Sequence, residues 1–381
     1  MRRAVAFAAL IASLAIGASS ARAARVADLG AGNSATVAVD PAGNGYVLWA
    51  ADDPADATHT VLAFCRLPAC APVLLPRPPF GEAHDPHLLR RRADGALFAV
   101  AAGENGAAQY VTYLWTSLDG GATWSGPAPV GGGLRNIDAA ALTSDGRAID
   151  LVQGIVSHDG FQRVPLGGAP ESRLVSLLPE PSGAPTVFYY SLNVAELRTG
   201  GPMLIADDHH RRTRYRLFAG GDLYANASWT PWAAAKALHS GDPSLGDGAL
   251  GPAIVTQGGV ASPRIYAQRW LGTRFSRRRT IGRLTLNGGA GPVLAQAPAG
   301  GLHAAWLVAA RQCHRFDCIA YRASRRGLRF GHERRFRIGR GAAPIPRRMA
   351  IAADVAGHGW LVWSDGQGTG AHVGRVRALG F

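Results

Sequence analysis

Short apolar runs separated by glycine-containing turns recur along the chain, and each run has the length of a β-strand. Residues 35–49 read ATVAVDPAGNGYVLW and residues 348–363 read RMAIAADVAGHGWLVW, so in both segments two strand-like runs flank a turn that contains Asp and Gly. Such a pattern predicts a β-hairpin. Four further segments repeat it, at 88–100, 139–152, 174–190 and 292–308.

The turn glycines of these six segments set the period of the repeat. They are Gly43, Gly95, Gly146, Gly183, Gly300 and Gly357. The intervals between them are 52, 51, 37, 117 and 57 residues. Because 117 corresponds to about two periods, we expect a seventh copy between residues 201 and 265, with its turn at Gln257, Gly258 and Gly259.

A second hairpin follows each copy, as at 61–75, 110–130 and 319–338. Four strands about every 50 residues are typical of propeller blades, because one small sheet must stack against its neighbours to bury both faces. We therefore predict an all-β fold, a β-propeller of seven four-stranded blades. Six or eight blades are alternatives, and two β-sandwiches fit the composition but not the regular spacing.

The last copy ends at Phe381 after about three strands, whereas a strand-like piece at 25–30 precedes the first copy. We expect this N-terminal strand to complete the last blade and close the ring, which removes exposed sheet edges.

The composition agrees with this architecture. The 49 glycines and 24 prolines make up close to a fifth of the 381 residues, and charged residues make up only 17%. Long exposed helices and coiled coils are thereby excluded. The hydrophobic share of 47% is enough for a large core.

The N-terminus has the features of a secretory signal peptide. Arg2 and Arg3 precede an apolar run at 4–17, and Ala21-Arg22-Ala23 has the small-x-small form of a cleavage site. The apolar run is shorter than the roughly 20 residues that span a bilayer. We expect residues 1–23 to be removed and residues 24–381 to form one secreted propeller domain without a transmembrane segment.

Four cysteines form two pairs of equal spacing, Cys65 with Cys70 and Cys313 with Cys318. In an exported chain such pairs predict local disulfides, although four cysteines allow three connectivities. Zinc ligands usually have two intervening residues and occur in reducing compartments, so a metal or redox role is the weaker alternative. Each pair brackets a turn, and we expect it to hold a hairpin.

Positive charge is concentrated in one sector of the chain. The formal charge is +14, and removing Arg2, Arg3 and Arg22 leaves 14 − 3 = +11. Residues 264–348 contain 19 arginines but only two acids, Asp317 and Glu333. Such a sector either binds an anionic polymer or is an ordinary solvated face. No aromatic stacking motif accompanies it, so no nucleic-acid partner is expected.

Within this sector, residues 334–340 read RRFRIGR. The alternation predicts a strand with guanidinium groups in solvent and with Phe336 and Ile338 directed inward.

One specific motif is present: residues 117–124 read SLDGGATW and match the Asp-box pattern S-x-D-x-G-x-T-W. The defined positions are Ser117, Asp119, Gly121, Thr123 and Trp124. Asp119 can accept backbone N–H groups, Gly121 can adopt a positive φ, and Trp124 can cover the hairpin.

In this motif the chain resembles the sialidase-like β-propeller superfamily, in which the Asp-box lies between the third and fourth strands of blades, on the face away from the active site. The resemblance implies the same fold. It also implies that the two cysteine pairs occupy the equivalent turn in the first and sixth repeats.

Sialidases of that family use an arginine triad, a Tyr–Glu nucleophile pair, an Asp acid/base and an Arg-Ile-Pro motif early in the chain. That motif is absent after the signal peptide, and Phe336-Arg337-Ile338-Gly339 resembles it only loosely and near the other end. No residue is therefore carried over as catalytic.

The starts of the innermost strands are expected to line the axial mouth, where propellers commonly bind ligands. A carboxylate pair such as Asp85 and Asp138 is the minimum for glycoside hydrolysis. Candidate binding residues are His84, His87, Asp247 and Arg347. The alternative is that all of these are ordinary turn and strand-start residues.

We expect no metal and no cofactor. His84 and His87 point to opposite faces of a strand, and residues 207–212 (DDHHRR) read as a polar loop. The first hypothesis is a secreted, monomeric, non-catalytic propeller that binds a carbohydrate or an anionic cell-surface polymer. The second is a divergent exo-glycosidase, and the third is a scaffold whose rim pairs with another protein.

Overall fold

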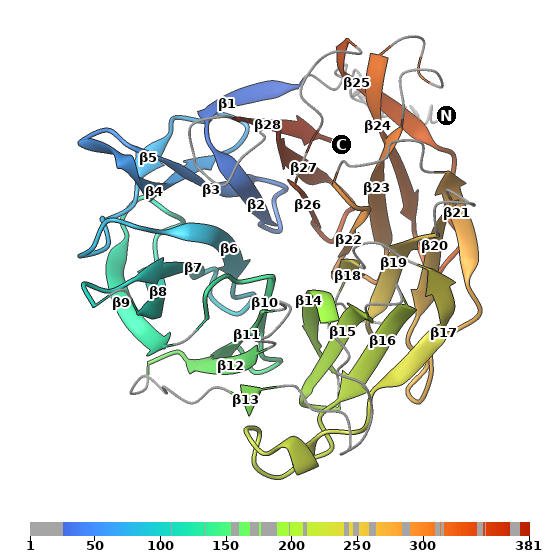
Figure 1. Cartoon of the computed structure of the whole chain (residues 1–381). Coiled ribbons are helices and arrows are strands. Elements are labelled where there is room, and N and C mark those ends of the chain that lie inside the picture. The colour runs from blue at the N-terminus through green and yellow to red at the C-terminus, as the bar shows by residue number, and fades with distance from the viewer. Residues whose placement is uncertain are drawn as a thin grey trace, which may run out of the picture.

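Seven four-stranded antiparallel sheets surround a central axis as the blades of a β-propeller (Figure 1). The computed structural model describes residues 26–381 except 108, 133, 154–159, 168–174, 177–188, 198, 209–211, 240–243, 247–250, 259–263, 284–289, 309–312, 314–315, 341–345, 347 and 366–373. The predicted all-β fold with seven blades is confirmed. Residues 1–23, the expected signal peptide, lie outside the described residues.

Consecutive strands form six of the blades. From the innermost to the outermost strand, blades 1 to 3 are β2 (Asn33–Val39), β3 (Gly45–Asp53), β4 (Asp56–Arg66) and β5 (Val73–Leu74); β6 (His84–Arg90), β7 (Leu97–Glu104), β8 (Tyr110–Ser117) and β9 (Ser125–Gly132); and β10 (Ala139–Leu142), β11 (Ala148–Gln153), β12 (Gly160–Pro165) and β13 (Val175–Ser176). Blades 4 to 6 are β14 (Tyr189–Glu196), β15 (Pro202–Asp208), β16 (Arg212–Leu217) and β17 (Ala233–His239); β18 (Ser244–Gly246), β19 (Ala253–Gln257), β20 (Arg264–Arg269) and β21 (Arg279–Arg283); and β22 (Val293–Gln296), β23 (Leu302–Val308), β24 (Phe316–Ser324) and β25 (Arg334–Arg340). A short 3-10 helix, η1 (Asn226–Ser228), precedes β17.

Blade 7 joins the two ends of the chain. Its strands are β26 (Arg348–Ala353), β27 (Gly359–Ser364), β28 (Arg375–Gly380) and, as the outermost strand, β1 (Ala27–Ala31). β1 pairs antiparallel with β28, and Arg375 Nε lies 2.6 Å from Asp28 Oδ2. The prediction that the N-terminal strand closes the ring is confirmed.

A left-handed glycine occupies the turn between the first two strands of every blade. These residues are Gly43, Gly95, Gly146, Gly200, Gly251, Gly300 and Gly357, with φ between 68° and 91°. Their intervals are 52, 51, 54, 51, 49 and 57 residues, which is more regular than the sequence had indicated. A Cβ in this backbone conformation is strained, so glycine fixes the period of the fold.

Two of the expected turn positions are therefore wrong. Gly183 lies outside the described residues, and it precedes β14, the inner strand of blade 4, whose turn is at Gly200. Gln257 ends β19, the second strand of blade 5, so Gly258 follows that strand and the turn is at Gly251. The pattern misled because β18 has only three residues, too few to show alternation.

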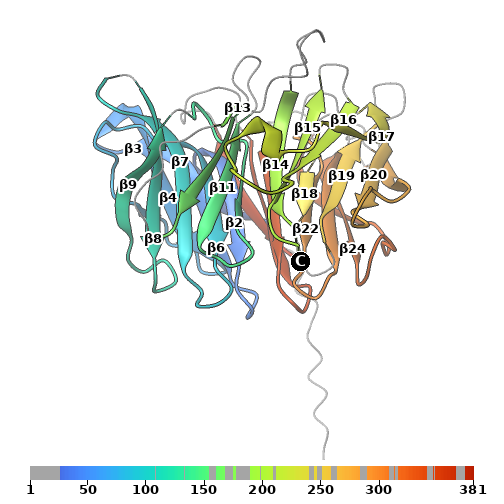
Figure 2. The same ribbon diagram turned by 90° about the horizontal axis from the view of Figure 1, so that it is seen from below.

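The core is divided among the interfaces between blades. Among the described residues, seven clusters of buried apolar side chains occur, and each joins two neighbouring blades. At one of them Phe64 of blade 1 packs with Leu97 and Trp115 of blade 2. The second and third strands are buried on both faces, which explains their nearly continuous apolar runs. Figure 2 shows the blades from the side of the ring.

The Asp-box closes the turn between β8 and β9 and contacts the neighbouring blade. Asp119 Oδ1 accepts hydrogen bonds from Ser117 Oγ at 2.8 Å and from the Thr123 N–H at 2.9 Å. Gly121 has φ +90°, and a Cβ there would collide with Phe64 of blade 1. The Trp124 ring packs edge-on against the same Phe64 at 5.1 Å. The turn thus fastens blade 2 to blade 1.

Both predicted disulfides are present, Cys65–Cys70 and Cys313–Cys318, but only one lies at the expected turn. Cys65 is the penultimate residue of β4 and Cys70 precedes β5, so this disulfide lies at the turn equivalent to the Asp-box. Cys313 lies between β23 and β24, the second and third strands of blade 6. Consecutive turns of an antiparallel sheet lie at opposite ends, so the second disulfide is on the other face of the ring.

Candidate functional site

The inner strands run side by side around the axis, and their starts meet at one mouth (Figure 1). β6 begins with His84 and Asp85, β26 begins with Arg348, and Asp138 directly precedes β10. Two of the candidate binding residues, Asp247 and Arg347, lie outside the described residues.

Asp85 is the centre of a charged cluster that links blade 2 to blade 7. Arg348 Nη2 lies 2.7 Å from Asp85 Oδ1, and His84 Nδ1 donates to Asp85 Oδ2 at 3.4 Å. Burial alone would raise the pKa of Asp85, but the hydrogen bond from His84 and the charge of Arg348 lower the pKa to about 2. The carboxyl group is therefore ionised and cannot serve as a general acid near neutral pH.

Asp138 and His87 link the next blades. The Asp138 carboxylate accepts hydrogen bonds from the Leu192 N–H of blade 4 at 3.2 Å and from Asn136 Nδ2 at 2.9 Å. His87 Nε2 donates to the Ile137 carbonyl at 3.0 Å. Burial lowers the pKa of His87 to about 4, so the ring is neutral. The mouth residues thus form polar contacts that connect blades 7, 2, 3 and 4.

A repeated β-bulge sets the direction of the side chains at the mouth. The register shifts between Asn33 and Thr36 in β2, and between His84 and His87 in β6. In the described chain, Ser34 and Asp85 are the two non-glycine residues with positive φ, at 52° and 48°, and each lies in one of these bulges. Bulges of this kind redirect side chains next to functional sites. The sequence gives no sign of Ser34.

Within the described residues, most arginines of the basic sector lie on the third and fourth strands of blades 5 and 6 and in the turns between them, whereas Arg348 begins β26 of blade 7. Arg335 and Arg337 of β25 are exposed, whereas Phe336 and Ile338 pack against the core between blades 6 and 7, as the alternation predicts. Arg264 of β20 pairs directly with Arg283 of β21, and both are exposed. Like charges opposite one another destabilise a sheet, so this arrangement is unfavourable for folding alone.

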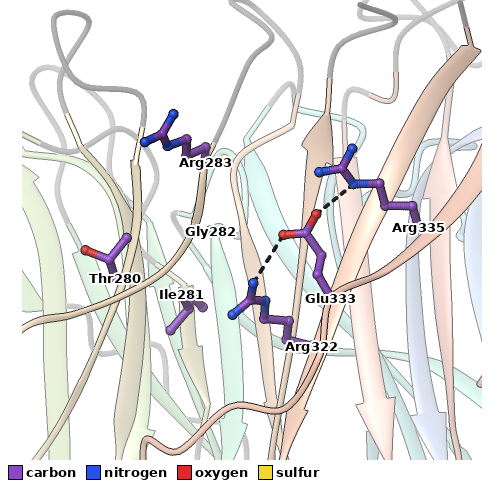
Figure 3. A pocket seen from close by; sticks show the side chains of 7 residues that line it. All are labelled: Thr280, Ile281, Gly282, Arg283, Arg322, Glu333 and Arg335. Atoms are coloured by element: carbon purple, nitrogen blue, oxygen red, sulfur yellow. Dashed lines mark hydrogen bonds and ion pairs between the residues drawn. The ribbon is translucent and has the colours of Figure 1, made fainter. Parts of the chain in front are cut away.

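A groove of about 310 Å³ lies between the outer parts of these two blades (Figure 3). It is lined by Thr280, Ile281, Gly282, Arg283, Arg322, Glu333 and Arg335. Arg335 Nε lies 2.7 Å from Glu333 Oε1, and Arg322 Nη2 lies 3.7 Å from Glu333 Oε2. Arg283 stands on the opposite wall with its guanidinium directed away from Glu333 (Figure 3).

Sequence reasoning did not identify this groove as a site. Glu333 was visible as one of two acids among 19 arginines, but nothing in the sequence placed Arg322 and Arg335 on either side of it. The neighbouring Gly282 was not identified either. A Cβ at Gly282 would collide with Trp306, so glycine allows β21 to approach blade 6 closely.

The described residues contain no group of three or more His, Cys, Asp or Glu side chains that could hold a metal ion. Asp207 lies in β15, and residues 209–211 of the polar loop lie outside the described residues. In the part of the chain that is described, no helix is long and apolar enough to cross a membrane.

No protein-family model matches the chain, and a sequence search finds no significant match among curated proteins. Several solved structures are similar. A protein of unknown function from Dyadobacter fermentans is 12% identical, with a TM-score of 0.48, over 93% of this chain and 95% of its own. An α-L-arabinanase from Penicillium chrysogenum complexed with arabinobiose is 11% identical, with a TM-score of 0.47, over 94% and 98%. The NanB sialidase from Streptococcus pneumoniae is 11% identical, with a TM-score of 0.44, over 92% and 68%.

Proposed function

We propose that this protein is a secreted, non-catalytic β-propeller that binds a carbohydrate or an anionic polymer of a cell surface. The observation that carries the proposal is the excess of positive charge on blades 5 and 6. Residues 264–348 hold 19 arginines against two acids, and the exposed arginines line the outer strands around the groove. A concentrated positive field attracts polyanions and increases their rate of association.

The arrangement of the mouth supports binding without turnover. Glycoside hydrolysis needs one carboxyl group that stays protonated near neutral pH as the acid. The low pKa of Asp85 and its contact with Arg348 do not suit that role. Both oxygens of Asp138 accept hydrogen bonds from blade 3 and blade 4. Both aspartates thus contribute to the contacts between blades.

The test is binding of the purified mature protein to immobilised polygalacturonate and to neutral dextran, at 50 mM and at 500 mM NaCl. We expect retention on the acidic polymer at low salt, at least tenfold weaker binding at high salt, and no retention on dextran. Reducing-sugar release from both polymers is measured in parallel and is expected to equal the protein-free blank. Equal binding at both salt concentrations would count against electrostatic recognition.

A divergent glycosidase at the mouth is the second candidate function. The strained backbone of Asp85 favours it, because residues held at positive φ gather at active sites. A hydrolysis screen over aryl glycosides, including arabinofuranosides and sialosides, tests it. Turnover that disappears in both Asp85→Asn and Asp138→Asn would establish this function and overturn the non-catalytic proposal.

A further inference from the structure

We propose that the groove between blades 5 and 6 binds one carboxylate group of an acidic sugar, with Arg322 and Arg335 holding the carboxylate. In the free protein Glu333 takes the place of that group. The inference rests on the proposed function, because it names the chemical group that the arginine-rich sector recognises.

The internal carboxylate shows what the two arginines can hold. Glu333 lies between them, with Oε1 2.7 Å from Arg335 and Oε2 3.7 Å from Arg322 (Figure 3). The guanidinium plane suits a planar carboxylate, which can accept two parallel hydrogen bonds. A carboxylate from a ligand therefore fits the same space.

Positive charge in the groove exceeds what Glu333 can neutralise. Three guanidinium groups line it, and Glu333 supplies a single negative charge. The Nε atom of Arg322 is buried and has no hydrogen-bond acceptor among the described atoms. The Arg283 side chain makes no hydrogen bond or ion pair within the described part of the chain. The rest of the Arg322 side chain is 29% exposed, so a ligand carboxylate can reach its terminal guanidinium nitrogens.

The dimensions of the groove favour a sugar over an isolated ion. A volume of about 310 Å³ is near the lower end of small-molecule sites and accommodates one or two sugar rings. The Thr280 side chain lies on the wall opposite Arg322 and Arg335 and can hydrogen-bond a ring hydroxyl (Figure 3). Ile281 and Gly282 line the groove beside Thr280.

The ligand carboxylate would compete with Glu333 for both arginines. The Arg335 side chain is 42% exposed, whereas the Arg322 side chain is 29% exposed. The contact of Glu333 with Arg335 is a charge-assisted hydrogen bond of 2.7 Å, whereas its separation of 3.7 Å from Arg322 is beyond hydrogen-bond distance. Glu333 therefore acts as an internal competitor, and removing its charge should improve binding instead of weakening it.

The experiment measures the affinity of the mature protein for trigalacturonate by isothermal titration calorimetry, with the fully methyl-esterified trimer as the uncharged ligand. We expect Arg322→Gln and Arg335→Gln to weaken binding about tenfold, as for the loss of one charge-assisted hydrogen bond. Glu333→Gln should strengthen binding about fivefold. The methyl ester should not bind.

Two charge-matched controls separate the groove from general electrostatics. Arg329→Gln removes an exposed arginine of blade 6 that does not line the groove, and Glu104→Gln removes an acid of blade 2. Both should change affinity less than twofold. Near-ultraviolet circular dichroism shows whether each variant is folded. If an arginine variant does not fold, Glu333→Gln, which preserves the size of the side chain, still tests the inference.

The inference is overturned if Arg329→Gln weakens trimer binding as much as Arg322→Gln does, or if Glu333→Gln behaves like Glu104→Gln. Polygalacturonate binding is measured on the same variants. If the polymer binds wild type and the arginine variants equally, the groove inference fails and the proposed function stands. If the polymer does not bind wild type at any salt concentration, the proposed function itself fails.

Discussion

The axial mouth and the groove between blades 5 and 6 use charge in opposite ways. At the mouth, Asp85 meets Arg348 of blade 7 and Asp138 meets the Leu192 N–H of blade 4, so each aspartate is used to join blades. In the groove, three guanidinium groups line the walls and Glu333 is the single acid among the lining residues. The mouth aspartates have an ion-pair or hydrogen-bond partner on a neighbouring blade, whereas the groove is lined by more guanidinium groups than carboxylates.

The difference separates residues that hold the ring together from residues available to a ligand. A polar contact in which both groups are satisfied contributes to stability. Its loss leaves the remaining buried group without a hydrogen-bond partner in apolar surroundings. A surplus of exposed charge contributes nothing to stability and can repel itself. Substitutions at the mouth should therefore lower stability, whereas substitutions in the groove should change binding.

The largest effect is expected from acid. Burial lowers the pKa of His87 to about 4 from 6.5, so the folded state holds this ring neutral. A group whose pKa is lower in the folded state contributes stability above its unfolded pKa and loses it as pH falls towards the folded value. The free energy of unfolding should fall between pH 6.5 and pH 4, by about 3 kcal/mol from His87 alone.

This pH dependence is measured by urea unfolding at pH 7 and pH 4. His87→Gln keeps an N–H for the Ile137 carbonyl but does not titrate, so its decrease should be about 3 kcal/mol smaller than that of wild type. The exposed His332→Gln serves as the matched control and should follow wild type. Equal pH profiles for all three proteins would contradict the role of His87.

A somewhat smaller effect is expected from Asp138→Ala. The variant leaves the Leu192 N–H without its acceptor, and Leu192 is fully buried. Urea unfolding at pH 7 should show a loss of about 2 kcal/mol, within the usual range for an unsatisfied buried donor. Asp138→Asn keeps one acceptor and should lose about half as much. A loss below about 0.5 kcal/mol in Asp138→Ala would show that this contact does not hold blades 3 and 4 together.

The ion pair between Asp85 and Arg348 should contribute less. Arg348 is 46% exposed, so solvent screens the pair. A double-mutant cycle with Asp85→Asn and Arg348→Gln should give a coupling energy of about 0.5–1 kcal/mol. A coupling energy of zero would show that this ion pair does not help to hold blades 2 and 7 together.

The smallest effect on stability is expected in the groove. Glu333→Gln removes the acid from a partly exposed cluster, and the free energy of unfolding measured with urea should change by no more than about 0.5 kcal/mol. The same variant is expected to change ligand affinity, so stability and binding separate at this residue. A loss as large as that of Asp138→Ala would make Glu333 a structural group.

The sequence was sufficient for features that depend on neighbouring residues. Turn glycines such as Gly43 and Gly357, the two cysteine pairs and the N-terminal closing strand follow from local pattern and spacing. The turn positions predicted for blades 4 and 5 were wrong. The Pro- and Gly-containing sequence around Gly183 has the pattern of a hairpin turn, and β18 is very short. The turn of Cys313 was misplaced because spacing alone does not tell which end of a blade a turn occupies.

The two sites differ in how far the sequence predicts them. His84, Asp85 and Asp138 could be placed at the mouth because every inner strand begins there. Their partners could not be predicted, since Arg348 is 263 residues from Asp85 and meets it only when blade 7 closes the ring. The groove depends on the contact of blade 5 with blade 6, and on Gly282, whose lack of a side chain leaves no pattern in the sequence.

The most direct test of the central claim is a crystal structure of the mature protein with trigalacturonate. We predict a sugar carboxylate about 3 Å from the guanidinium groups of Arg322 and Arg335, with Glu333 moved away from Arg335. A ligand bound at the axial mouth against Arg348, with Glu333 still between its two arginines, would contradict the distinction between a mouth that holds the ring together and a groove that binds the ligand.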